Sequence, residues 1–441
     1  FATGLAISTM LKHLGFTKDS KEPFVIFAGR QTSDGDTAHV PSQVAESMGI
    51  PQATFVEHVE ADGEGNVIAK RIIEGGYQML QLPMPCTISL TPTGIAPRKP
   101  SLSGAIKARN AKITMLSCDD IGLGTEKIGL SGSPTIVAAV VNIVSERAPV
   151  MMSHGANEKE LVTNMIANFK TGGNTLEKKE KKEKEVKEAP DFPVKDTREG
   201  AKGILTWAEV VNGKIGRPSL ELLTPARHLA DQLGNDTKIS TVLIGNNVKE
   251  LAKTLFEHGS DEVILVENPK LEEYLVLPFS NIITQIIRER NPEIALFAAT
   301  TAGRELAPRI GMKTGSGVTA DCTGLEIGEY IDRKNKEIIR PILHSRRPTY
   351  GESKLATILG FVYPQISTAR AGTFEVPECE EGREGTISEF TPKLNDEDFT
   401  VEIQKTVRGE GGLQNLFEAD IIVSGGRGTT SDNLVQVKAL A

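Results

Sequence analysis

The chain has 441 residues, and 50 lysines and arginines against 58 aspartates and glutamates give it a formal net charge of −8. At about 100–200 residues per domain, this length predicts two to four domains. A mildly acidic chain without a basic tail argues against holding DNA or RNA by phosphate neutralisation. No run of about 18 apolar residues is present, so we expect no membrane span. The four cysteines are far apart in sequence, which argues against a zinc site or an iron–sulfur cluster and favours a reduced, cytoplasmic protein.

A charged segment, residues 176–190, divides the chain. It mixes lysine and glutamate and has almost no apolar residue, so it cannot dock on a core, and we interpret it as a tether. We therefore predict a nucleotide-binding domain over 1–170, a charged linker over 171–200, and a second domain over 201–390. A connector and the start of a truncated flavin-type domain follow over 391–441.

The first part begins with a short apolar strand predicted over 24–28. A polar loop follows, and Pro41 opens the next predicted helix. The pattern then changes to strands at 55–59, 67–73 and 77–82, which glycine-rich turns separate as in hairpins.

The second part alternates strands with helices, which predicts a parallel sheet covered on both faces. It ends in hairpin signals, as the first part does. Because both parts share a buried strand, a loop, a proline near a helix start and hairpins, we interpret them as two related α/β domains. A chance similarity of generic strand–loop–helix units stays open. The predicted strands are 203–207, 241–244, 262–266 and 294–299, the helices 220–233, 248–256 and 282–287, and the hairpin segments 319–326, 337–343 and 355–360.

The loop from Gly29 to Val40 is the strongest candidate site. It follows a buried strand and precedes a helix, so it lies at the carboxyl end of a sheet, where α/β proteins bind ligands. Its small residues and the helix start favour a phosphate. Asp34 and Asp36 would repel a bare phosphate, so they suit ribose or adenine groups, turn-shaping hydrogen bonds or a metal. A plain Asp/Gly turn capped by Thr37 also stays open. The candidate cofactor-binding residues are Gly29, Arg30, Gln31, Thr32, Asp34, Gly35, Asp36, Thr37, Ala38, His39 and Val40.

Several other polar residues have two interpretations each. Arg304 lies in the equivalent loop of the second part and suits either a phosphate or a surface ion pair. Arg346 and Arg347 suit a cofactor phosphate, a partner carboxylate or plain solvation. His39 and His344 have no Ser/Asp or Cys partner at a catalytic spacing, so we interpret each as a hydrogen-bonded or solvated histidine.

A glycine-rich turn lies near the end of the sequence. Ser424, Gly425, Gly426 and Arg427 follow an apolar run and precede a helix-like stretch, as in a phosphate-binding loop with Arg427 as its cation. A single βα unit cannot bury its own apolar face, so we expect the rest of that domain to be missing or supplied by another chain.

Together, these stretches resemble the electron-transferring flavoproteins. Residues 1–150 are similar to most of the β subunit, and residues 203–374 to the first domain of the α subunit. Residues 423–428 resemble the opening of the α subunit's flavin domain. The supporting stretches are 29–40, 97–102 with 107–108, and 129–135 in the β-like part, and 219–223, 319–326, 347–348, 364–365 and 368–370 in the α-like part.

The resemblance implies an α/β fold of two related domains. Their mostly parallel sheets are flanked by helices and carry hairpin extensions, as in the adenine nucleotide hydrolase-like fold, and the first βα unit of an incomplete flavin domain follows. It implies that the loop 29–40 holds AMP, as in simple carriers, or a second FAD, as in electron-bifurcating members. The form of residues Asp34–Ala38 looks more like the bifurcating members, whose flavin accepts hydride from NADH. Arg427 matches an arginine that contacts FAD, and Leu130 falls near the loop that docks on acyl-CoA dehydrogenases.

The implied function is electron transfer between NADH, with or without ferredoxin, and an acyl-CoA dehydrogenase. The implied cofactors are one or two FAD, with AMP as the alternative in the first site, and no metal or catalytic side chain is expected. Tyr350–Lys354 and Ala371 depart from the family pattern. A non-redox, adenine-nucleotide-binding regulatory protein is the alternative. An ATP-using transferase would need a phosphate loop with a catalytic lysine, which is not evident.

Overall fold

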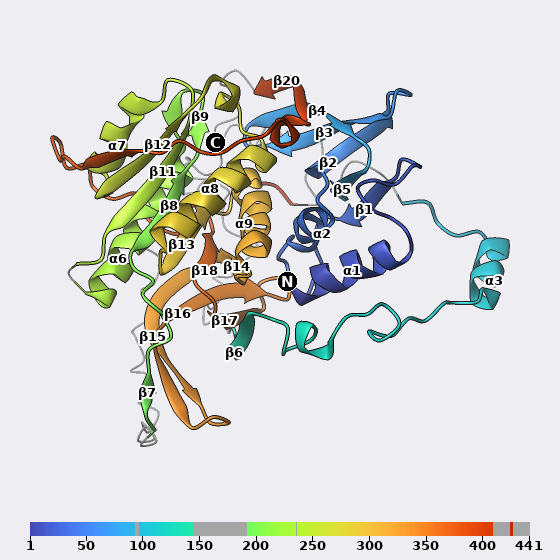
Figure 1. The fold of residues 1–441 in the computed structure, drawn as a ribbon, viewed down its shortest axis with the longest axis horizontal. Helices are drawn as coiled ribbons and strands as arrows, with labels where there is room; N and C mark the ends of the chain where they lie inside the picture. Colours follow the sequence, from blue (N-terminus) through green and yellow to red (C-terminus); the bar gives the residue numbers. More distant parts are fainter. Residues whose placement is uncertain (93–96, 144–191, 235, 409–423, 427–441) are drawn as a thin grey trace, which may run out of the picture.

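The computed structural model describes residues 1–92, 97–143, 192–234, 236–408 and 424–426. Two α/β parts lie side by side, with helices α2 and α9 where they meet (Figure 1). The charged segment 176–190 lies outside the described residues, so the predicted tether and domain limits stay predictions. None of the helices in the described ranges is long and apolar enough to cross a membrane.

The first part is built on a sheet of order β1-β5-β2-β3-β4-β20, parallel from β1 to β2 and antiparallel beyond. It confirms the predicted strand, loop, helix and hairpins. Helix α2 has Pro41 in its first turn and ends at Gly49, whose φ of +69° suits glycine. The elements are α1 (Ala2–His13), β1 (Val25–Gly29), α2 (Val40–Met48), β2 (Gln52–Ala61), β3 (Asn66–Ile73), β4 (Gly76–Pro83) and β5 (Cys86–Leu90).

The second part has the predicted parallel sheet, in the order β14-β18-β13-β8-β11-β12-β19. Helices α8 and α9 pack on one face and α6 and α7 on the other, so both faces of its apolar strands are buried. The strands are β8 (Ile204–Ala208), β11 (Ile239–Gly245), β12 (Glu262–Glu267), β13 (Ile294–Ala298), β14 (Val318–Cys322), β18 (Gln365–Ala369) and β19 (Thr386–Glu389). The helical elements are α5 (Arg217–Glu221), α6 (Leu223–Leu233), η2 (Lys249–Leu251), α7 (Ala252–Glu257), η3 (Pro269–Leu271), α8 (Val276–Arg290), α9 (Thr301–Thr314) and η4 (Asp396–Phe399).

Two predicted helices differ from the structure. The helix expected over 220–233 is divided into α5 and α6. The one expected over 282–287 is the much longer α8, which starts at Val276 with Pro278 in its first turn. Proline fits there because the first N–H groups of a helix need no partner within the helix. The sequence mixes apolar and polar residues there, so its pattern did not predict where α8 starts.

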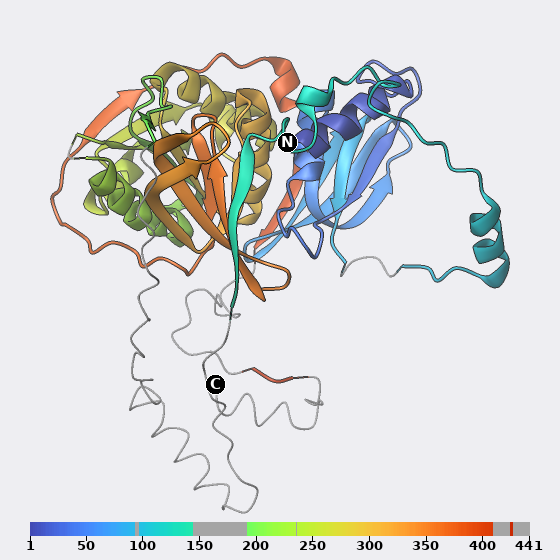
Figure 2. The ribbon, with the colours of Figure 1, turned by 90° about the horizontal axis from the view of Figure 1, so that it is seen from below.

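Each part contributes one strand to a sheet of the other. Strand β6 (Thr135–Asn142) pairs antiparallel with β17 (Lys354–Gly360), next to β16 (Glu337–Thr349) and β15 (Gly324–Asp332), and lies along the second part (Figure 2). In return, β20 (Glu402–Arg408) pairs antiparallel with β4. The order β1-β5-β2 matches the order β13-β18-β14. This topology supports the interpretation of two related domains. Three short strands, β7 (Val194–Lys195), β9 (Val210–Val211) and β10 (Lys214–Ile215), complete the described set.

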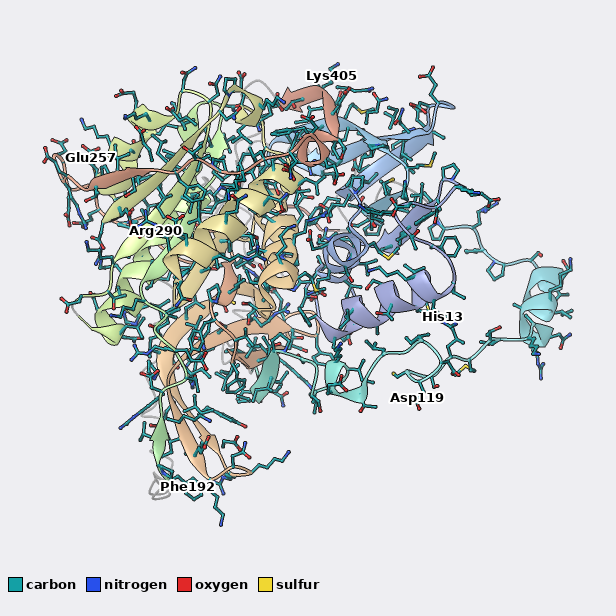
Figure 3. All side chains as sticks on the ribbon, in the orientation of Figure 1. His13, Asp119, Phe192, Glu257, Arg290 and Lys405 are labelled. Atoms are coloured by element: carbon teal, nitrogen blue, oxygen red, sulfur yellow. The ribbon has the colours of Figure 1, made fainter. Side chains whose placement is uncertain are left out.

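An arm between β5 and β6 leaves both parts at α3 (Leu102–Asn110) and returns to α1 after the short η1 (Thr125–Lys127) (Figure 1). A helix start was predicted at α3. The Ser101 side chain accepts a hydrogen bond from the Gly104 N–H and caps α3. Asp119 marks the return of the arm toward the body of the molecule (Figure 3).

Buried ion pairs join the two parts along α9. The fully buried carboxylate of Glu305 accepts hydrogen bonds from Arg71 Nη1 at 2.7 Å and from Thr54 Oγ1 at 2.6 Å. One helical turn further, the buried Arg309 donates to Glu46 at 2.9 Å and to Gln52 at 3.1 Å. The first part supplies Arg71, Thr54, Glu46 and Gln52, so these charges are satisfied only when the parts are together. Only the assembled protein gives the buried charges of Glu305 and Arg309 their oppositely charged partners.

Breaking the Glu305 pair should therefore destabilise the whole protein. We expect Glu305→Ala to lower the free energy of unfolding by about 3–5 kcal/mol, because it leaves Arg71 buried without its partner charge. Urea-induced unfolding measures this change. The control is Lys253→Ala, which removes the exposed ammonium paired with the partly buried Glu257 at 3.7 Å and should cost less than about 1 kcal/mol. Equal effects of the two variants would contradict the assigned role of Glu305.

Candidate nucleotide-binding site

The loop 30–39 lies at the carboxyl end of β1, as predicted, and leads directly into α2. The Arg30 N–H donates to the Leu90 carbonyl of the neighbouring strand β5 at 3.0 Å. Asp36 and Ala38 have positive φ angles of +50° and +58°. Such backbone is uncommon outside glycine, and it clusters at ligand-binding positions.

Hydrogen bonds within the loop fix its turn. The Asp36 N–H donates to the Thr32 carbonyl at 3.0 Å, and Gln31 Nε2 donates to Asp36 Oδ1 at 2.9 Å. A hydrogen bond from Thr32, followed by the Gly35 N–H, holds the pKa of the exposed Asp34 below its ordinary value. Asp36 thus accepts a hydrogen bond within its own loop, as the turn-shaping interpretation expects. No cluster of three metal-ligating side chains exists among the described residues, so the metal interpretation has no support there.

A turn of the second part covers this loop. The Thr349 hydroxyl and the Tyr350 N–H both donate to the Asp34 carbonyl. Both donors lie where β16 ends and the chain turns toward β17. The loop therefore faces a wall that comes from residues more than 300 positions away in the chain.

Two buried groups at this wall lack partners. Arg347 is 5% exposed, and its Nε and Nη2 atoms have no hydrogen-bond partner in the described part of the chain. His39 is 6% exposed, and its Nε2 atom likewise has none there. Burial, aided by the positive charge of Arg347, lowers the pKa of His39 to about 3, so the ring is neutral. Of the interpretations left open by the sequence, solvation is excluded for both His39 and Arg347, because both side chains are buried.

Three other arginines of the second part, Arg304, Arg370 and Arg346, are already paired with carboxylates. Arg304 donates to Asp321 at 2.6 Å and to the Ala299 carbonyl at 2.8 Å, so its ion pair is half-buried rather than on the surface. Arg370 donates to the same Asp321 at 2.7 Å. Arg346 pairs with Glu326 on the surface. Arg347 is thus the arginine of this group whose charge is left without a carboxylate partner.

The residues present fit the adenosine-phosphate end of a nucleotide cofactor. A buried guanidinium without a partner is costly, and an anionic group offers it charge-assisted hydrogen bonds. The helix start at Val40 favours the same charge. We find these donors next to the predicted loop, but Arg347 and Thr349 were not assigned to it from sequence. No local signal could assign them, since only folding brings them near.

Two other predicted sites are not brought to this loop by the described contacts. Ser424, Gly425 and Gly426 are exposed and belong to no regular element, and Arg427 lies outside the described residues. Leu130 is 84% exposed just after η1. His344 is hydrogen-bonded, as predicted, through Nε2 to the Glu329 carbonyl at 3.1 Å.

The fold and the site define a protein of two paired α/β domains, in which each domain covers a strand-end loop of the other. The sequence profile of the electron transfer flavoprotein domain matches residues 6–120 and 204–395, more than half of the chain. The chain therefore belongs to the electron transfer flavoprotein family.

Relatives of both subunit types are similar to the chain. The α subunit of the electron transfer flavoprotein of Thermoanaerobacterium thermosaccharolyticum is 39% identical over 52% of this chain and 66% of its own length. The β subunit from the same organism is 35% identical over 38% of this chain and 60% of its own length. Subunit LctC of the lactate dehydrogenase (NAD(+),ferredoxin) of Acetobacterium woodii is 31% identical over 52% of this chain. This chain spans only 51% of LctC's length.

The buried His39 predicts a pH dependence of stability. Because its pKa is near 3 in the folded chain and near 6.5 when unfolded, the unfolded state binds more protons between these values. The free energy of unfolding should therefore fall as the pH drops below 6.5, with His39 contributing up to about 1.4 kcal/mol per pH unit. Urea unfolding from pH 7.5 to 5 measures this slope.

His39→Asn should make that slope shallower. The exposed His13→Asn is the matched control and should leave it in place. An unchanged slope in His39→Asn would show that the ring is not held neutral.

Proposed function

We propose that this chain is the nucleotide-holding framework of an electron carrier that passes electrons between NADH and an acyl-CoA dehydrogenase. The observation that carries the proposal is the unpartnered guanidinium of Arg347 facing the loop 29–40. In this proposal the loop holds the adenosine end of FAD, with AMP as the alternative occupant. Arg347 meets a phosphate, and Asp36 and Thr37 shape the turn around the nucleotide.

The bound flavin would supply the redox chemistry, and the residues of this chain would bind it, orient it and tune its electrostatics. Burial, the largest effect, lowers the pKa of the Arg347 guanidinium, and the charge of Asp36 opposes this shift. A cation at this position favours an anionic group of the cofactor. The buried, neutral ring of His39 leaves that charge balance unchanged at physiological pH.

The relatives support the choice of redox partners. One similar protein is named for NAD(+) and ferredoxin together, and another is named acryloyl-CoA reductase electron transfer subunit beta, from Anaerotignum propionicum. We therefore propose NADH as the donor, with ferredoxin as a second acceptor in a bifurcating reaction. The proposed setting is the cytoplasm.

The flavin domain that begins near Arg427 is proposed to be completed by residues outside this sequence, on this polypeptide or on a partner chain.

Strand β1 has an open outer edge within the described residues, and Phe27 on it is 56% exposed. A strand added at this edge would cover that apolar side chain and extend the sheet beside the loop.

Replacing Arg347 tests the nucleotide site. We expect Arg347→Met to reduce the nucleotide that copurifies with the protein by at least tenfold, because the phosphate loses its buried cation. Release by denaturation, followed by chromatography and visible absorption, identifies FAD or AMP and its amount. Arg346→Met is the control, since Arg346 is exposed and pairs with Glu326, and it should keep its nucleotide.

Bulky replacements of Asp36 and Thr37 should likewise strip the nucleotide. Unchanged nucleotide content in these variants and in Arg347→Met would overturn the site. A colourless protein that releases only AMP would instead favour the non-redox regulatory alternative.

The exposed Leu130 is proposed to dock on the dehydrogenase. We expect Leu130→Glu to slow electron transfer to an acyl-CoA dehydrogenase several-fold while leaving the bound flavin unchanged, because a charge there opposes burial of the contact. Stopped-flow reduction of the dehydrogenase measures the rate. Leu14→Glu, at an apolar residue that is 54% exposed on another element, is the control. Equal rates in the two variants would argue against docking through Leu130.

A further inference from the structure

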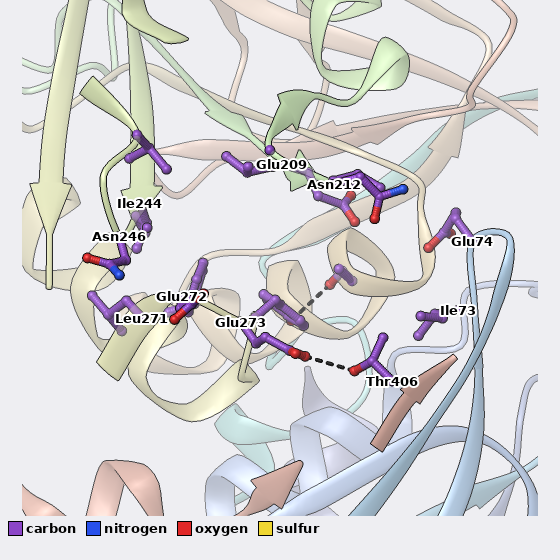
Figure 4. Close-up of a pocket in the computed structure, with 18 of the residues that line it drawn as sticks. Ile73, Glu74, Glu209, Asn212, Ile244, Asn246, Leu271, Glu272, Glu273 and Thr406 are labelled. Carbon is purple, nitrogen blue, oxygen red and sulfur yellow. Dashed lines mark hydrogen bonds between the residues drawn. The ribbon is translucent and has the colours of Figure 1, made fainter. Parts of the chain in front are cut away.

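A cavity lies between the two parts of the molecule, away from the loop 29–40. It has a volume of about 520 Å³, within the usual range for small-molecule sites. Its floor is formed by the ends of β8 and β11 and the start of α9. The β3–β4 turn and β20 of the first part close it from the other side (Figure 4).

The cavity occupies the position in the sheet where ligands usually bind. From β8, the chain adds β11 and β12 on one side of the sheet and then crosses to β13 on the other side. The carboxyl ends of β8 and its neighbours therefore open a crevice at a topological switch point, where open α/β sheets bind ligands. The related loop of the first part follows β1, which corresponds to β13. The cavity and the loop 29–40 are thus counterparts in the duplicated fold.

The positions that would attract a phosphate are already taken here. At the start of α9, the Thr301 N–H donates to the carboxylate of Glu74, which reaches over from the β3–β4 turn. At the start of η2, the Val248 and Lys249 N–H groups donate to Glu267 at 2.8 and 3.2 Å. The protein's own carboxylates hold both helix starts, so a ligand phosphate would meet negative charge instead of free N–H groups.

The cavity wall keeps a donor without a partner. Trp207 is 2% exposed, and its indole N–H has no hydrogen-bond partner among the described residues. The Nε atom of Arg408 also has none there. Trp207 packs at a tilt against Tyr274, with 5.7 Å between ring centroids, and meets Phe279 edge-on at 6.2 Å, which gives the cavity an aromatic wall. An acceptor on the ligand would satisfy the indole N–H, which is otherwise costly to bury.

Polar groups that line the same cavity suit the remaining edges of such a ligand. Glu209 and Glu273 line the cavity with Asn246, whose amide offers both donors and an acceptor. Glu209 accepts from the Thr300 hydroxyl at 2.8 Å through one oxygen. Burial, with a smaller effect of the Glu74 charge, raises the pKa of Glu209 to about 7, so a protonated carboxyl is available there as well.

We propose that this cavity binds an unphosphorylated nucleoside, whose base lies toward the aromatic wall and whose hydroxyls meet the carboxylates. The ligand contacts both parts of the molecule, because Glu74 and Arg408 come from the sheet of the first part and Trp207 from the second. This site is separate from the loop 29–40, so its occupancy does not depend on the cofactor proposed there.

Trp207 is the only tryptophan of the chain, so its fluorescence reports directly on the cavity. Titration of the purified protein with adenosine should change this fluorescence saturably, and calorimetry should give the same affinity. AMP should bind at least tenfold more weakly, because Glu74 and Glu267 occupy the anion positions. Arg347→Met should bind adenosine as the unaltered protein does, which separates this site from the nucleotide proposed at the loop.

Two variants test the polar edge of the cavity. Asn246→Ala and Glu273→Gln should each weaken adenosine binding about tenfold, and Asn110→Ala on the distant α3 should not. No response of either readout to millimolar adenosine would overturn the proposal. Equal affinity for AMP and adenosine in Arg347→Met, which lacks the cation proposed to hold a phosphate at the loop, would overturn the unphosphorylated class of ligand. Loss of adenosine binding in Arg347→Met would assign that binding to the loop instead.

Discussion

The buried charges along α9 are the interaction on which the rest of the structure depends. Glu305 and Arg309 lie one turn apart on a helix of the second part, and their partners Arg71 and Glu46 belong to the first. Each of these charges is buried against its counter-charge only when the two parts are in this arrangement. A shift of one part along the other would leave a buried charge without its partner. The ion pairs therefore fix the register of the two parts as well as their association.

Strand exchange extends this fixed register to both ends of the interface. Because β6 pairs with β17 and β20 pairs with β4, each sheet is completed by the other part. The same geometry brings the β16–β17 turn over the loop 29–40 and the β3–β4 turn over the start of α9. A hairpin turn from the opposite part thus covers each strand-end loop, and residues from both parts form both candidate sites.

The two sites have diverged chemically while keeping this arrangement. At the first, the opposite part brings the unpartnered cation Arg347, which suits an anionic ligand. At the second, it brings the carboxylate of Glu74, which occupies the helix start itself. In our two proposals, one duplicated architecture serves a phosphate-bearing ligand at one end and disfavours phosphate at the other, because the opposite part brings a cation to one loop and a carboxylate to the other.

Local patterns in the sequence predicted several strands of both sheets, the hairpins and the position of the loop 29–40 at a strand end, but not β5 or β18, which lie inside the sheets. Apolar runs, prolines at helix starts and glycine-rich turns act over a few residues, so they can be read without the fold. Tertiary structure alone decided that His39 is buried, that Arg347 reaches that loop, and that Glu305 is a buried partner of Arg71. Those facts depend on contacts between residues more than 200 positions apart. Such contacts decide whether a charged side chain is buried, and its neighbours in the sequence do not indicate this.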